Sequence, residues 1–209
     1  PVWIHCKGYL VRDDNTKPLY MIGCINEIGE RQKADNVSGL LGESGFREYM
    51  NQLDTPLETG YLLRIGIDHF KEINDNFGQE YGDFVLKKTA ECISGCTSEG
   101  QKVYKLVADE FLILDVSSDE VKDADKIYDK VREAIDRFIE TNEFKVMYTV
   151  SGGIVPFAAL KGNQCSEALK LTDFALNEAK KLGRNRCYIF NGETYRKFLR
   201  KREITQEPV

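Results

Sequence analysis

The chain contains 209 residues, of which 42% are hydrophobic and 30% are charged, and its formal net charge is −5. This balance is typical of a soluble globular protein and excludes a largely disordered chain. The length suits one ordinary domain plus an extension. Because the chain is acidic, it lacks the basic surface that a nucleic-acid duplex requires, and we expect no nucleic-acid partner.

The cysteines and apolar runs exclude several other classes. The six cysteines do not follow the spacing of a zinc site, and we interpret them as reduced thiols of a cytoplasmic protein: Cys6, Cys24, Cys92, Cys96, Cys165 and Cys187. No apolar run reaches the ~18 residues needed to span a bilayer, and no signal peptide is recognisable. Because the chain begins at Pro1, we expect a piece of a longer protein, whose full length could be membrane-anchored.

Residues 2–28 predict two strands around a turn, because apolar segments flank a cluster of turn-forming residues at 12–18. The segment 23–31, G-C-I-N-E-I-G-E-R, resembles the G-x-x-x-D-I-T-E-R that often ends a PAS sensor domain. A generic hairpin is the alternative interpretation. An isolated hairpin is only marginally stable, so this one needs more of a sheet, or a surface elsewhere, to bury Trp3 and Ile22.

The rest of the chain predicts alternating helices and strands. After a polar connector, Ser44 is the candidate N-cap of a helix. The strand at 60–68 alternates, so that Arg64 and Gly66 share one face. The helix at 81–94 is expected to turn Phe84 inward. The remaining predicted elements are a hairpin at 102–107 and 110–116, helix 119–141, strand 145–155, helix 166–182, strand 187–190 and helix 193–201.

This order mixes hairpins with crossovers, which predicts an α+β fold with a mostly antiparallel central sheet flanked by helices. Three segments resemble signatures of GGDEF domains, the diguanylate cyclases that condense two GTP into cyclic di-GMP. Residues 66–78 follow D-x-D-x-F-K-x-I-N-D-x-x-G, residues 107–111 (V-A-D-E-F) replace G-G-(D/E)-E-F, and residues 175–186 match A-L-x-x-A-K-x-x-G-R-N-x. Residues 35–40 resemble the D-x-x-T-G-L that opens such domains. The resemblance covers about residues 35–192 and implies the nucleotidyl-cyclase fold, a ferredoxin-like palm.

The chain departs from this family where the family binds metal. Phosphoryl transfer needs divalent cations to neutralise developing charge, and the resemblance places them on the first Asp of D-x-D and the third residue of G-G-(D/E)-E-F. The first position is Gly66, which has no side chain to offer, whereas Asp109 and Glu110 remain as remnants of the catalytic centre. Asp68, roughly 7 Å along the strand, is a candidate substitute. The resemblance therefore implies a weak metal ligand at Asp109, Mg²⁺ as a doubtful cofactor and no intact catalytic residue.

The two signature glycines are replaced by Val107 and Ala108. Glycine lets a backbone approach a ligand closely and adopt a positive φ. We expect both side chains to narrow the space over a nucleotide. Alternatively, the β-branched Val107 simply extends a strand edge.

The positions that hold the nucleotide in the family are retained. By resemblance, Asn74 and Asp83 hydrogen-bond guanine, since Asp can accept from N1–H and the exocyclic amine, while Asn can both donate and accept. A helix cap or turn residue is the alternative for Asn74. Backbone amides around His69, Phe70 and Lys71 would cap the phosphates.

The same resemblance assigns Lys180 and Arg184 to the terminal phosphates as charge-assisted donors. A solvated basic helix end is the alternative interpretation of both. The inhibitory product site R-x-x-D of the family would fall at residues 98–101, which read S-E-G-Q, so feedback inhibition is not expected.

We therefore predict a degenerate GGDEF signalling domain that binds GTP as a regulatory module and is catalytically inactive. The alternatives are an active diguanylate cyclase and a structural dimerisation module without a ligand. The predicted domains are a PAS-like hairpin at 1–31, a linker at 32–42, the GGDEF domain at 43–192 and a C-terminal helix with the outgoing linker at 193–209. Expected partners are GTP, an upstream PAS sensor, a downstream EAL phosphodiesterase domain and a second copy of the chain.

Overall fold

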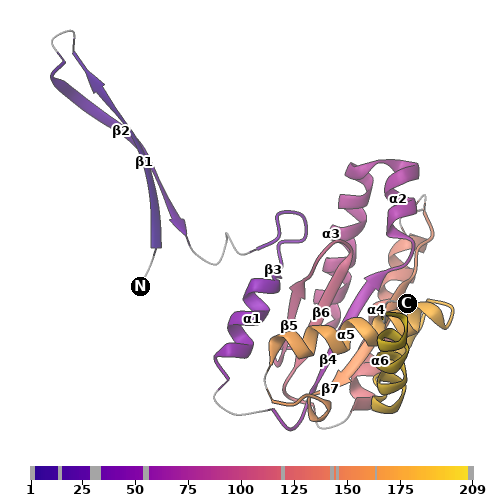
Figure 1. Ribbon diagram of the computed structural model, residues 1–209. Coiled ribbons are helices and arrows are strands. Elements are labelled where there is room, and N and C mark those ends of the chain that lie inside the picture. The colour runs from indigo at the N-terminus through magenta and orange to yellow at the C-terminus, as the bar shows by residue number, and fades with distance from the viewer. Residues whose placement is uncertain are drawn as a thin grey trace.

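The computed structural model describes residues 3–13, 16–28, 34–53, 57–118, 121–141, 144, 146–162 and 164–206. Its main body is a six-stranded sheet with helices on both faces (Figure 1). The strands of this sheet are β3 (Leu41–Gly42), β4 (Tyr61–Ile67), β5 (Gln101–Lys105), β6 (Glu110–Asp115), β7 (Val150–Pro156) and β8 (Cys187–Ile189). The α-helices are α1 (Glu43–Asn51), α2 (Phe70–Phe77), α3 (Gln79–Cys96), α4 (Val121–Thr141), α5 (Cys165–Lys181) and α6 (Gly192–Gln206).

The strand order is β3-β5-β6-β4-β7-β8. The central neighbours β5, β6, β4 and β7 pair antiparallel, whereas the outer strands β3 and β8 pair parallel to β5 and β7. This arrangement confirms the predicted α+β class and the mostly antiparallel central sheet.

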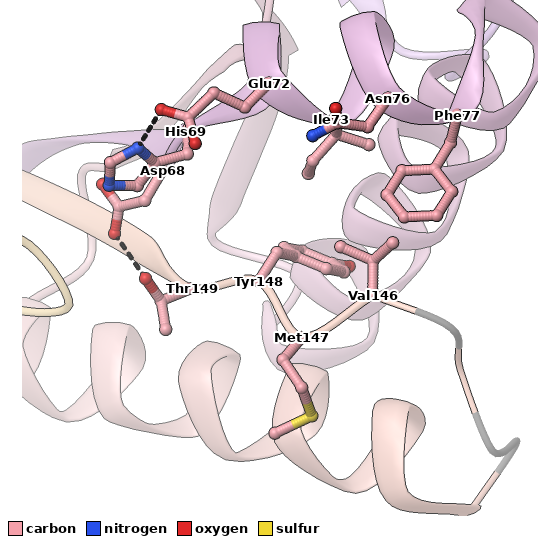
Figure 2. Close-up of a pocket in the computed structure, with 10 residues that line it drawn as sticks. All are labelled: Asp68, His69, Glu72, Ile73, Asn76, Phe77, Val146, Met147, Tyr148 and Thr149. Carbon is pink, nitrogen blue, oxygen red and sulfur yellow. Dashed lines mark hydrogen bonds and ion pairs between the residues drawn. The ribbon is translucent and has the colours of Figure 1, made fainter.

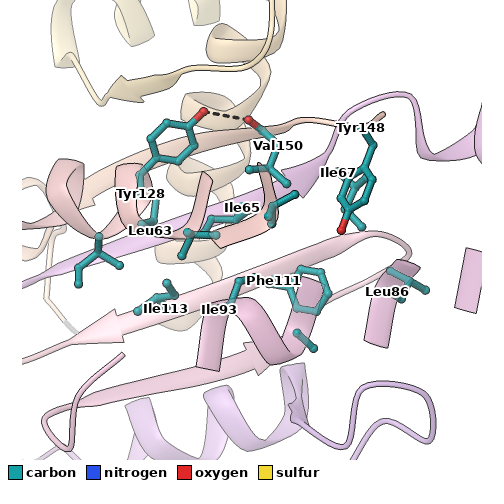
Figure 3. Packing of buried hydrophobic residues seen from close by; sticks show 14 of the residues in the cluster. Leu63, Ile65, Ile67, Leu86, Ile93, Phe111, Ile113, Tyr128, Tyr148 and Val150 are labelled. Atoms are coloured by element: carbon teal, nitrogen blue, oxygen red, sulfur yellow. Dashed lines mark hydrogen bonds between the residues drawn. The ribbon is translucent and has the colours of Figure 1, made fainter. Parts of the chain in front are cut away.

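Side chains of β4 point alternately to the two faces of the sheet. Because helices cover both faces, these side chains contribute to two separate apolar cores. One core joins the odd-numbered side chains of β4 to α3, α4 and the residues before β7 (Figure 3), including Leu63, Ile65, Ile67, Leu86, Ile93, Tyr128 and Tyr148. The opposite face carries Leu62, which belongs to a cluster with Phe46 of α1 and Ala168 of α5. Covering both faces explains why β4 is apolar almost throughout.

Helix α5 lies very close to the sheet, and two glycines make this approach possible. A Cβ added at Gly153 of β7 would lie 2.3 Å from the backbone nitrogen of Leu176. A Cβ added at Gly66 would lie 3.1 Å both from Cδ2 of Leu176 and from Nζ of Lys180. Gly66 therefore has a packing role in addition to its place in the signature segment.

The N-terminal segment forms its own two-stranded sheet, in which β1 (Trp3–Arg12) pairs antiparallel with β2 (Pro18–Ile28), as the ribbon in Figure 1 shows. This confirms the two strands around a turn. The assignment of this hairpin to a PAS domain stays a prediction. The side chains of Trp3 and Ile22, which we expected to need a covering surface, lie outside the described part of the structure.

Several local expectations were wrong. Helix α2 was not predicted, because it is short and buries only Ile73. Ser44 lies inside α1 and is not its N-cap; the cap is Gly42, which makes no side-chain hydrogen bond there. Gly42 pairs with β5, and α1 follows it directly at Glu43. The helix therefore begins earlier than the sequence indicated.

Two further corrections concern the predicted helix at 81–94 and strand at 145–155. Phe84 is 42% exposed, because it lies at the edge of an aromatic cluster and stacks on Phe144 with ring centroids 5.6 Å apart. The strand begins only at Val150, which pairs with Ile67, the last residue of β4. Within the described ranges, no helix is both long and apolar enough to cross a membrane.

Asp115, at the end of β6, should make stability depend on pH. Burial opposes its ionisation, but hydrogen bonds from Gln101, Ser118 and Ser117 outweigh this and lower its pKa to about 2. A lowered pKa adds stability above the unfolded-state value near ~3.9, and this stability is lost as the pH falls towards the folded value. We therefore expect Asp115→Asn to destabilise the fold at pH 7 by about 2 kcal/mol.

Urea unfolding from pH 7 down to pH 3 measures this effect. The difference between the wild type and Asp115→Asn should shrink below about pH 4. The control Asp136→Asn changes an exposed residue of α4 and should stay within ~0.5 kcal/mol of the wild type. A difference that does not depend on pH would contradict the assignment.

Candidate functional site

Two of the three signature segments meet directly at the end of β4. Gly66 pairs with Glu110 across the sheet, and the backbone nitrogen of Ile67 donates to the carbonyl oxygen of Asp109 at 3.3 Å. The third segment arrives with α5, whose Lys180 lies over Gly66. The structure therefore brings the predicted metal positions and one predicted phosphate ligand into a single group.

An ion cluster lies in this group. Arg64 of β4 donates to Oε2 of Glu110 from Nε at 2.7 Å and also from its terminal Nη2. Nζ of Lys180 lies 4.0 Å from Oε1 of the same carboxylate. The side chains of Arg64, Glu110 and Lys180 are only 12%, 18% and 25% exposed, so water screens their charges weakly.

Arg64 is also tied to α5, which the sequence analysis did not anticipate. Its Nη1 donates to the carbonyl oxygen of Leu169 at 3.2 Å, and its Nη2 lies 3.5 Å from Oδ1 of Asp173. The available signal was an arginine inside an otherwise apolar strand, on the same face as Gly66. Such a residue needs a buried acceptor, and Glu110 on the neighbouring strand is that acceptor.

Asp109 lies in a setting that disfavours its charged form. Burial raises the pKa of this carboxyl group, and the positive charge of Lys180 counters the shift only in part. The two signature carboxylates therefore differ, since Glu110 is held by a guanidinium while Asp109 is harder to ionise.

Asp68 is buried and already has its donors. Its Oδ1 accepts from the hydroxyl of Ser151 at 2.7 Å, and its Oδ2 accepts from the hydroxyl of Thr149 at 2.7 Å and from the backbone nitrogen of Asn185 at 3.1 Å. These bonds connect β4 to the segment after α5. The geometry fits a structural anchor rather than a substitute metal ligand.

These residues do not fit a divalent cation. Position 66 offers no oxygen, Glu110 is bound to Arg64, and an ammonium group stands beside Gly66. In the described part of the chain, no three His, Cys, Asp or Glu side chains gather in a way that would hold a metal ion.

The turn between β5 and β6 carries the replaced glycines. Val107 is 71% exposed, and because β5 ends at Lys105, the alternative that Val107 extends a strand is wrong. Ala108 adopts a left-handed backbone with φ of 55°.

The buried Lys105, which sequence reasoning missed, donates to the carbonyl oxygens of Leu106, at 3.0 Å, and Ala108. Burial lowers the pKa of this ammonium group, and nearby carboxylates oppose that shift.

The predicted guanine ligands form a second group between α2 and α3. Oδ1 of Asn74 is buried and has no hydrogen-bond partner among the described residues. A Cβ at Gly82 would come within 1.8 Å of this oxygen, so only glycine leaves room for the amide here. Asp83 follows directly on α3 and is partly exposed.

The other predicted ligands lie at helix ends. His69 has a left-handed backbone with φ of 58° and precedes α2 as its N-cap, followed by Phe70 and the exposed Lys71. Arg184 is exposed beyond the end of α5, also with a positive φ. The ring of Phe70 approaches Gly82 beside the amide of Asn74, but within the described residues no hydrogen bond or ion pair joins these side chains to Asn74.

A separate cavity lies beside the first signature segment. Figure 2 shows a cavity of ≈ 330 Å³ between α2 and the residues before β7, where His69 pairs with Glu72 at 2.6 Å. Tyr148 and the exposed Met147 also line it. Of the predicted nucleotide ligands it contains only His69, so it is not the candidate site.

Comparisons with known proteins point to one family. A family model described as "Diguanylate cyclase, GGDEF domain" matches residues 33–186. Diguanylate cyclase VdcA of Vibrio cholerae is 26% identical over 189 residues, which are 87% of this chain and 55% of that protein. Cyclic di-GMP phosphodiesterase NbdA of Pseudomonas aeruginosa is 28% identical over 169 residues, 78% of this chain and 21% of that protein. The chain thus spans little more than half of one of these relatives and a fifth of the other.

Solved structures agree with this match. A truncated form of YfiN (TpbB) from Pseudomonas aeruginosa, comprising only the GGDEF domain, aligns with a TM-score of 0.67 at 25% identity. The alignment covers 83% of this chain and 99% of that one. The palm-type fold that the three segments implied is therefore confirmed.

The left-handed backbone of Ala108 leads to a stability prediction. An L-residue in this region costs about 1 kcal/mol, which glycine avoids. We expect Ala108→Gly to raise the free energy of unfolding by ~0.5–1 kcal/mol, measured by urea denaturation. The control Ala134→Gly, in the middle of α4, should lower it by a similar amount. Destabilisation by both substitutions would contradict the backbone geometry at position 108.

Proposed function

Because the chain belongs to the GGDEF family of diguanylate cyclase domains, we propose that it binds GTP as a regulatory module of cyclic di-GMP signalling and does not condense it. The proposal separates two groups of residues. Asn74 and Asp83 recognise the base, while Lys180, Arg184 and the amides around Lys71 meet the phosphates. Catalysis is lost at Gly66, where the family's metal carboxylate is missing.

The observation that carries this proposal is the buried amide oxygen of Asn74. A buried acceptor without a donor costs about 1–3 kcal/mol, and such groups call for an explanation. Gly82 leaves the amide its space, and Asp83 adds a carboxylate on the next helical position. Guanine presents N–H donors along one edge, which is the chemistry that an amide oxygen and a carboxylate accept.

The ion cluster supports the loss of catalysis. A cyclase site needs a cation that polarises the phosphate and positions the attacking oxygen. Here Arg64 holds Glu110, and Lys180 stands against Gly66. A retained base pocket beside this altered centre suits binding without turnover.

A regulatory role follows if neighbouring domains respond to the bound nucleotide. A ligand shifts the conformational equilibrium towards the state that binds it better. In turn, a neighbouring domain that favours this state raises the affinity for the ligand. We propose a PAS sensor upstream of residue 32 and an EAL phosphodiesterase domain downstream of α6, in a cytoplasmic homodimer. The similarity to a cyclic di-GMP phosphodiesterase, of which the chain covers 21%, supports such an arrangement.

Calorimetric titration of GTP tests the base-binding residues. Each lost hydrogen bond to the base should cost about 1–3 kcal/mol. We therefore expect Asn74→Ala and Asp83→Ala each to weaken the affinity for GTP roughly tenfold or more. Asn76→Ala and Asp75→Ala are matched controls, since both residues are exposed on α2. ATP, which lacks the same donors, should bind less tightly than GTP.

Absence of GTP binding at millimolar concentration would contradict the proposal and favour the dimerisation module. Equal weakening by the controls and by the two site variants would show that the helix, and not the amide, is responsible. Selectivity for GTP over ATP in the wild type, lost in Asp83→Ala, is the expected pattern.

An active cyclase is the second candidate, because Asp109 and Glu110 remain and one relative is a diguanylate cyclase. Incubation with GTP and Mg²⁺, followed by chromatography of the nucleotides, decides between the two. We expect no cyclic di-GMP, since position 66 cannot hold a metal. Product formation that stops in Glu110→Gln would establish the cyclase instead.

A further inference from the structure

An ammonium group lies where the family's missing carboxylate would begin. Nζ of Lys180 is 3.1 Å from the place of a Cβ at Gly66 and 4.0 Å from Oε1 of Glu110. Its charge is also the main electrostatic influence on Asp109. Lys180 therefore lies beside position 66 and acts on Asp109, the two positions at which the family resemblance places the metal, and it also lies near Glu110.

The formal charges of the cluster indicate that it is neutral without a metal ion. Arg64 and Lys180 contribute two positive charges, and Asp109 and Glu110 contribute two negative ones, so these four side chains sum to zero. With an aspartate at position 66 and an apolar residue at position 64, the sum would be minus two, which a divalent cation neutralises. Glycine at position 66 and arginine at position 64 thus both remove the need for a metal.

The guanidinium of Arg64 is fixed in this role. It binds Glu110 through two nitrogens, lies 3.5 Å from the carboxylate of Asp173 and donates to the carbonyl oxygen of Leu169. If this planar guanidinium left its acceptors on two elements, the partly buried carboxylate of Glu110 would lose its partner. Lys180 is bound more loosely and remains one quarter exposed, so it can still turn towards an anion.

We propose that Arg64 and Lys180 are a built-in substitute for the divalent cation, so that the site takes the phosphates of a nucleoside triphosphate in its metal-free form. This inference rests on the proposed function and deepens it. Arg64 binds Glu110, the carboxylate that follows the family's metal position at Asp109, while Lys180 supplies a positive charge beside Gly66. Magnesium bound to the triphosphate then competes with the protein's own cations.

The first test is calorimetric titration of GTP into the wild-type chain, once with EDTA and once with excess MgCl₂. Because Mg²⁺ shields the phosphate charges that Lys180 attracts, we expect binding to be tighter in EDTA by a factor of about three to ten. Lys180→Met should remove most of this difference, whereas the exposed Lys87→Met on α3 should keep it. Binding that requires Mg²⁺ would overturn the inference.

The second test needs no nucleotide, so it separates this inference from GTP binding itself. Arg64→Met combined with Lys180→Met removes two of the cations near Asp109 and Glu110 and leaves Lys105. We expect this variant to bind Mn²⁺, followed by electron paramagnetic resonance, roughly tenfold more tightly than the wild type. The control combines Arg196→Met and Arg200→Met, which remove two exposed cations of α6 and should leave Mn²⁺ binding unchanged.

If the double variant is poorly stable, urea unfolding with and without Mn²⁺ gives the same information, because a metal that binds only the folded state raises the unfolding midpoint. A gain of Mn²⁺ binding in the variant supports the inference even if GTP fails to bind, in which case only the proposed function falls. Mn²⁺ binding that is equal in the wild type and the variant would overturn the inference.

Discussion

The close approach of α5 to the central sheet is the constraint on which the site depends. At Gly153 the backbone of α5 lies almost against β7, and at Gly66 the side chains of Leu176 and Lys180 lie over β4. A helix at this distance projects its last turn over the end of β4, which places Lys180 beside the signature carboxylates. The same approach lets Arg64 reach acceptors on both β6 and α5.

Packing and electrostatics are therefore coupled in this region. A Cβ at position 66 would lie 3.1 Å from the side-chain ends of Lys180 and Leu176. An aspartate there would require both side chains to shift by a few tenths of an ångström, which disfavours a metal ligand at this position. Arg64 adds to this effect because it removes Glu110 from the ligands available to a cation. The glycine at position 66 is thus compatible with both the packing of α5 and the charges around it.

The sequence was sufficient for the architecture but not for the ion cluster. The period of β4 and the order of elements predicted the sheet and its faces from local patterns, and the family resemblance implied that position 66 lies near Asp109. Arg64 and Lys105 were missed because their meaning depends on partners distant in the sequence. The short helix α2 was missed because a single buried residue, Ile73, leaves almost no periodic signal.

The group around Asn74 argues that the fold still has a ligand. Glycine inside a helix costs about 0.5–1 kcal/mol relative to alanine, and a buried unpaired carbonyl costs about 1–3 kcal/mol. Gly82 and Asn74 impose both costs together where α2 packs against α3. A domain that served only as a scaffold would be more stable with alanine at position 82 and an apolar residue at 74. The proposed guanine base, through its N–H donors, would satisfy the amide and offset both costs, which a dimerisation module would not do.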